Sequence, residues 1–176
     1  MGTKQLVRIA VLGAIGFLLM LLEFSILPWA PFLQYDPGEV PALLGGFAMG
    51  PWQGLAIVTV RSVLFFISGK DEAGWIGTLA SFVVGALFVL GSAPIYRRRR
   101  SKRGAVTALL VGSIVTVAGM AAANYYFFLP LWMAGAPRAA MGEMIVKAVI
   151  PFNLIKVLLT SALTFLLYKR VSPLLH

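Results

Sequence analysis

Residues 105–129 read AVTALLVGSIVTVAGMAAANYYFFL and contain no charged side chain. The run is longer than the roughly 20 residues that a helix needs to cross the hydrocarbon core of a bilayer. The basic run RRRRSKR at residues 97–103 lies just before it. Because clustered positive charge marks cytoplasmic loops, this stretch predicts a transmembrane helix that starts in the cytoplasm.

The rest of the chain has the same apolar character. Of its 176 residues, 60% are hydrophobic and only 12% are charged, which is more apolar than the core of a soluble protein of this size can enclose. Apolar segments bounded by proline, glycine or charge lie at residues 6–27, 39–50, 52–69, 75–96, 105–129 and 148–168. The second segment is too short to cross a bilayer alone, so we expect it to be tilted or recessed against its neighbours. The predicted fold is an all-α integral membrane protein with six transmembrane helices in a single domain, residues 1–176.

Lysine and arginine near the segment ends predict the orientation. They cluster at the amino end (Lys4 and Arg8), in the basic run at residues 97–103 and at the carboxyl end (Lys169 and Arg170). In a six-helix chain these three places lie on one side of the membrane, so both termini are predicted to be cytoplasmic. This topology also explains the net charge of +9 without a nucleic acid partner.

The sequence lacks the residues that several classes of function require. The sequence contains no cysteine and one histidine, His176, so we expect no metal site. We find no nucleophile–base pair or carboxylate dyad inside the apolar segments, and therefore expect no catalytic residues. A glycine-rich nucleotide-binding loop is also absent from the sequence, so any ATP hydrolysis would take place in partner chains.

Polar residues inside apolar helices are costly and therefore indicate function. Asn153 and Lys156 lie three apart in the motif Pro-Phe-Asn-Leu-Ile-Lys, on one face of the sixth helix. Asn124, followed by two tyrosines, is expected at the same depth on the fifth helix, and Thr78 and Ser81 reach that level on the fourth. An amide and an ammonium suit a planar heterocycle that carries carbonyls and ring nitrogens.

Each of these groups also has a structural interpretation. Lys156 could extend its ammonium to the membrane interface while Asn153 bonds a neighbouring backbone group. The tyrosines after Asn124 could form an aromatic belt. The small hydroxyl side chains of Thr78 and Ser81 could serve close helix packing.

The segment Phe-Leu-Gln-Tyr-Asp-Pro-Gly-Glu-Val-Pro at residues 32–41 is stiffened by its prolines. It lies on the predicted outer side and leads into the second helix. Leu33, Gln34 and Tyr35 are expected to face an outward-opening cavity, although an ordinary helix connection is the alternative. Ligand should therefore protect this loop if it closes over the site.

Arg61 lies midway along the third apolar segment, where a guanidinium facing lipid would be very unfavourable. We expect it to form a structural ion pair with Asp36 or Glu39. On the first helix, Ala10 and Ala14 lie four apart, and small residues at this spacing allow another helix to approach closely. Internal packing is the competing explanation for the two alanines.

Four features together resemble the riboflavin-specific substrate-binding (S) subunits of energy-coupling factor (ECF) transporters over nearly the whole chain. They are Ala10-x-x-x-Ala14, the loop at residues 32–41, Asn124-Tyr125-Tyr126 and the motif from Pro151 to Lys156. The resemblance implies a multi-pass protein of a prokaryotic plasma membrane that binds riboflavin from outside. It also implies partnership with one membrane scaffold subunit and two ATPase subunits.

The resemblance further implies roles for individual residues. Asn124, Asn153 and Lys156 would hydrogen-bond the isoalloxazine ring, while Ala10 and Ala14 would meet the scaffold. Riboflavin would be the transported ligand, not a cofactor, and acceptance of its phosphorylated form, FMN, stays open. The alternatives are an S subunit for another vitamin such as thiamine, or an intramembrane structural or assembly subunit.

Overall fold

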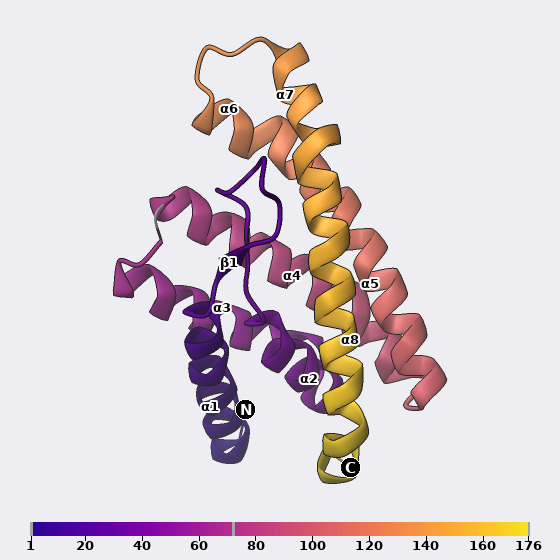
Figure 1. Ribbon diagram of the computed structural model, residues 1–176. Helices are drawn as coiled ribbons and strands as arrows, with labels where there is room; N and C mark the ends of the chain where they lie inside the picture. Colours follow the sequence, from indigo (N-terminus) through magenta and orange to yellow (C-terminus); the bar gives the residue numbers. More distant parts are fainter. Residues whose placement is uncertain (1, 72, 176) are drawn as a thin grey trace.

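The computed structural model describes residues 2–71 and 73–175, so His176 and the outermost ends of the predicted domain lie outside the described residues. About four fifths of the described chain is helical, which confirms the predicted all-α class (Figure 1). The helical elements are α1 (Thr3–Met20), α2 (Glu39–Met49), α3 (Pro51–Ser68), α4 (Gly74–Arg98), α5 (Lys102–Ala123), η1 (Asn124–Phe128), α6 (Leu129–Trp132), α7 (Arg138–Met144), η2 (Ile145–Val149) and α8 (Ile150–Leu175). The segments η1 and η2 are π-helical.

Within the described residues, five helical segments are long and apolar enough to cross a membrane. They cover Thr3–Met20, Pro51–Ser68, Gly74–Arg98, Lys102–Trp132 and Arg138–Tyr168. The last two contain 31 residues each, about 46 Å of helix, and so extend beyond the roughly 30 Å hydrocarbon core. With 11 residues, α2 is too short to cross unaided. The protein is therefore an all-α, multi-pass membrane protein, and the count of six crossings stays a prediction.

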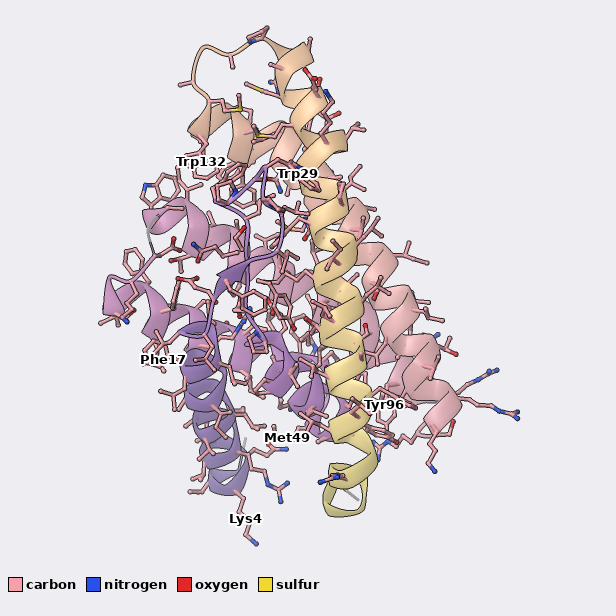
Figure 2. The ribbon with its side chains drawn as sticks, in the orientation of Figure 1. Lys4, Phe17, Trp29, Met49, Tyr96 and Trp132 are labelled. Carbon is pink, nitrogen blue, oxygen red and sulfur yellow. The ribbon has the colours of Figure 1, made fainter. Side chains whose placement is uncertain are left out.

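The molecule has two distinct ends. The loop end carries Trp29 and Trp132, and the terminal end carries Lys4, Met49 and Tyr96 (Figure 2). Between them, large apolar side chains point outward. Ile67 is 74% exposed and Ile114 is 69% exposed, as expected for side chains that face lipid.

The first apolar segment was expected to be helical over residues 6–27, but α1 ends at Met20. The chain then becomes extended, and β1 (Phe24–Ser25) pairs antiparallel with β2 (Gln34–Tyr35). Leu27 is buried beneath this hairpin in a cluster that includes Tyr35 and Phe152. Its apolar character therefore serves packing of the loop against α8, and Pro28 disfavours helical geometry at this point.

The fifth and sixth helices are longer than predicted, and a proline lies inside each of them. The predicted segments were residues 105–129 and 148–168, whereas the helices continue to Trp132 and begin at Arg138. Pro130 and Pro151 each lie two residues after a π-helical segment. A proline ring clashes with the carbonyl four residues earlier, and that carbonyl lies inside η1 or η2 in each case. The wider π turn accommodates the ring, so the helix continues.

Candidate ligand-binding site

A cavity of about 400 Å³ opens near the loop end, where Trp132 forms part of its wall (Figure 2). The walls come from the end of α1, the loop after it, the facing ends of α3 and α4, the α5–η1 junction and α8. Six residues that the sequence predicted to bind ligand line it: Leu33, Gln34, Ser81, Asn124, Asn153 and Lys156. The fold thus brings together residues separated by more than a hundred positions.

The two asparagines are held in the same way. Asn124 Nδ2 donates to the Met120 carbonyl at 2.8 Å, and Asn153 Nδ2 donates to the Val149 carbonyl at 2.9 Å. Because a carbonyl only accepts, these bonds fix which amide atom is the nitrogen. Each amide keeps its oxygen and one N–H for another partner.

Asn153 Oδ1 is the least satisfied of these groups. The residue is 3% exposed, and this oxygen has no hydrogen-bond partner in the described part of the chain. The hydroxyl of Ser81, in the same cavity wall, is also buried without a partner there. An unsatisfied buried polar group costs about 1–3 kcal/mol, which a polar ligand would recover.

Two further predicted residues do not line the cavity. Tyr35 is buried behind the wall, where its ring packs edge-on against Phe24. Burial raises the pKa of the Tyr35 hydroxyl, which therefore stays neutral. The Thr78 hydroxyl donates to Asp71 Oδ2 at 2.9 Å.

Four buried charged residues form a network beside the cavity, which we call the buried quartet: Asp36, Glu39, Arg61 and Lys156. Arg61 Nη1 lies 3.7 Å from Asp36 Oδ1, and Arg61 Nη2 lies 3.3 Å from Glu39 Oε1. Lys156 Nζ lies 3.0 Å from Asp36 Oδ2 and 3.3 Å from Glu39 Oε1. The sequence analysis expected Arg61 to pair with one of the two carboxylates, whereas it lies near both.

The quartet changes the expected state of Lys156. Its ammonium was expected to donate to a ligand ring. It donates to Asp36 and also lines the cavity, so its bond to a ring stays a prediction. Burial opposes ionisation of Asp36, yet the charges of Lys156 and Arg61 hold the pKa of this carboxyl below its usual range. Through its ion pairs the quartet ties the loop to α2, α3 and α8.

The cavity also contains residues that the sequence analysis did not select. Glu23 and Asp71 line it. Asp71 Oδ1 accepts from the Ala73 N–H at 2.9 Å, in the turn just before α4. At the rim, Phe32 packs edge-on against Trp132 with ring centroids 5.1 Å apart. No spacing along the sequence links these two aromatic residues, which are brought together by the loop and α6.

Ala10 and Ala14 lie on an exposed face of α1, near the terminal end and away from the cavity. The packed face lies about 100° around the helix from the two alanines. Gly13 is buried close to Val60, and Gly16 is buried close to Arg61. The two alanines are exposed and lie beside this packed face, so they are accessible to another helix.

The family described as ECF transporter, substrate-specific component, matches residues 4–168. The chain belongs to this family. As a substrate-specific component, it is part of a transporter.

Two curated relatives align with almost the whole of this chain. The riboflavin transporter RibU of Staphylococcus aureus is 33% identical over 173 residues, which cover 96% of this chain and 90% of the relative. The riboflavin transporter FmnP of Bacillus subtilis is 31% identical over 179 residues, which cover 98% of this chain and 94% of the relative.

A solved structure of the S component of a bacterial ECF transporter has the same fold. It superposes with a TM-score of 0.84 at 34% sequence identity and covers 98% of this chain and 97% of that chain.

Proposed function

We propose that this chain is the riboflavin-binding subunit of an ECF-type vitamin uptake transporter. It captures riboflavin from outside the cell and delivers it inward when it is coupled to a separate ATP-hydrolysing module. The observation that carries the proposal is the buried, unsatisfied Asn153 Oδ1 in a cavity of about 400 Å³. The names of the two curated relatives support riboflavin as the vitamin.

The chemistry of the cavity suits a flavin ring. One edge of isoalloxazine carries an imide, with an N–H between two carbonyl oxygens. A tethered asparagine offers one oxygen acceptor and one remaining N–H donor, which complement such an edge. Phe32, Phe128 and Phe152 provide apolar surface for the ring, and the cavity volume is within the range typical of small-molecule sites.

In the proposed topology six helices cross the plasma membrane, with α2 recessed, and both termini are cytoplasmic. The cavity at the loop end then faces outward, and the basic run at residues 97–103 faces inward. The proposed partners are a membrane scaffold subunit and two ATPase subunits. The exposed face of α1 around Ala10 and Ala14 is the proposed contact with the scaffold.

Riboflavin binding by the purified protein tests the proposed function. We expect the protein in detergent to quench flavin fluorescence, and Asn153→Ala to weaken binding about tenfold to a hundredfold, because about 1–3 kcal/mol of hydrogen bonding is lost. Thr59→Ala, an exposed hydroxyl on α3, is the control and should leave affinity unchanged. Binding of thiamine without riboflavin would support another vitamin. Binding of neither vitamin by a folded protein would support a structural role.

The charges in the cavity predict a preference for riboflavin over FMN. Glu23, Asp36 and Asp71 line the cavity, and Lys156 is the one cation among its described lining residues. Because Lys156 is paired with Asp36, an added phosphate meets mainly negative charge.

Asp71→Asn tests this preference, since it removes one charge and keeps an oxygen acceptor for the Ala73 N–H. A unit charge about 4 Å away in water contributes about 1 kcal/mol, so we expect FMN affinity to rise about fivefold. Riboflavin affinity should change less than twofold, measured by titration of both ligands. Glu143→Gln, which removes an exposed charge outside the cavity, is the matched control. An unchanged ratio of the two affinities would contradict the electrostatic explanation.

A further inference from the structure

A second, smaller cavity of about 220 Å³ lies at the terminal end. It is formed where the turn between α2 and α3 meets the last turn of α4, and Met49, Trp52, Gln53, Arg97 and Arg100 line it. Figure 2 shows Met49 at the opposite end of the molecule from Trp132. The second cavity is therefore separate from the proposed riboflavin site.

Two guanidinium groups line this cavity without an acidic partner. Arg97 and Arg100 are three apart at the end of α4, and no carboxylate of the described residues lies within ion-pairing distance of either. The sequence itself has no acidic residue between positions 72 and 143. Both guanidinium groups are therefore available to an anion from another molecule.

The neighbouring residues make the cavity a fixed structure at a membrane boundary. The ring of Phe47 stacks on Tyr96 with centroids 4.4 Å apart, which holds the end of α2 against the end of α4. Trp52, in the first turn of α3, is 71% exposed. Exposed tryptophans at the ends of transmembrane helices lie at the level of lipid headgroups.

We propose that this cavity binds the phosphate group of an anionic glycerophospholipid in the leaflet nearest the terminal end. Arg97 and Arg100 bind the phosphate oxygens, for which guanidinium geometry is well suited. The Gln53 amide supplies a further donor, while Met49 and Trp52 contact the glycerol and upper acyl region. The apolar side chains of Met49 and Trp52 favour a lipid over free phosphate, because free phosphate gains nothing from them.

Lipid retention by the purified full-length protein tests this proposal. Native mass spectrometry in detergent would compare added phosphatidylglycerol, phosphatidylcholine and inorganic phosphate. We expect the unmodified protein to retain phosphatidylglycerol, and the Arg97→Gln, Arg100→Gln double variant to lose at least tenfold in affinity. Arg98→Gln, Arg99→Gln is the matched control, since it removes the same charge from residues that do not line the cavity. The control should stay within twofold of the unmodified protein.

The other outcomes would overturn the proposal. If both double variants lost affinity for phosphatidylglycerol equally, the lipid would be attracted by the total positive charge and not by this cavity. Retention of inorganic phosphate, or its displacement of the lipid, would assign the cavity to a free anion. If phosphatidylcholine were retained as well as phosphatidylglycerol, the cavity would not select a lipid by its net negative charge.

If the double variant does not fold, Arg100→Gln alone replaces it, because Arg100 lies after the end of α4.

Discussion

Replacing Arg61 with leucine is expected to lower the free energy of unfolding by about 3–5 kcal/mol. Arg61 is 0% exposed and lies near both Asp36 and Glu39. Without it, two buried carboxylates share the single ammonium of Lys156, and one negative charge has no counterion. The change is measured as the shift of the unfolding transition when the protein in mild detergent is titrated with SDS.

Two further variants separate this explanation from a general loss of packing. Adding Glu39→Gln to Arg61→Leu removes the excess negative charge, and we expect the double variant to recover part of the lost stability. Lys147→Leu breaks the exposed ion pair with Glu143 and should leave the unfolding transition almost unchanged. If Arg61→Leu were no more harmful than Lys147→Leu, the quartet would not be a stabilising network.

Replacing both Ala10 and Ala14 with tryptophan is expected to abolish association with the scaffold and ATPase subunits while leaving riboflavin binding unchanged. Both alanines are exposed, and the proposed ligand residues lie toward the loop end. A bulky side chain at either alanine prevents the close helix approach that small residues allow. Co-purification of the partner subunits and flavin titration of the isolated subunit would measure the two effects separately.

The matched control is Val11→Trp, Ile15→Trp. These residues are also exposed and four apart on α1, but they lie about 100° further around the helix. Partner association should survive in this control. Normal association of the alanine variant would contradict the proposed contact face, and lost flavin binding would mean that the substituted face affects the fold.

Helix positions were predictable where hydrophobicity was continuous. The start of α2 and both ends of α3 lie within a residue of the predicted segments. Residues 21–27 were misassigned because a buried loop and a membrane helix can be equally apolar. The reach of the fifth helix was underestimated because a proline usually ends a helix, and sequence alone does not show a π turn that accommodates it. The sixth helix begins at Arg138 and not at residue 148, because charged residues such as Lys147 interrupt the apolar run without ending the helix.

The candidate site was partly predictable for a related reason. Asn124 and Asn153 stood out because amides are rare inside apolar helices, and both line the cavity. The partners of Lys156 did not follow from helix spacing, because its closest carboxylate lies 120 positions away in a loop. Nothing in the sequence marked Asp71 as a cavity residue, because acidic residues are common in surface turns. Only the fold shows that it lines the cavity.

The buried quartet has a consequence for the energy source of transport. Its two cations and two anions sum to zero charge. Moving one elementary charge across a membrane potential of 100 mV involves about 2.3 kcal/mol of electrical work. A neutral quartet that moves with the bound vitamin contributes no such work, so the voltage across the membrane neither drives nor opposes its displacement.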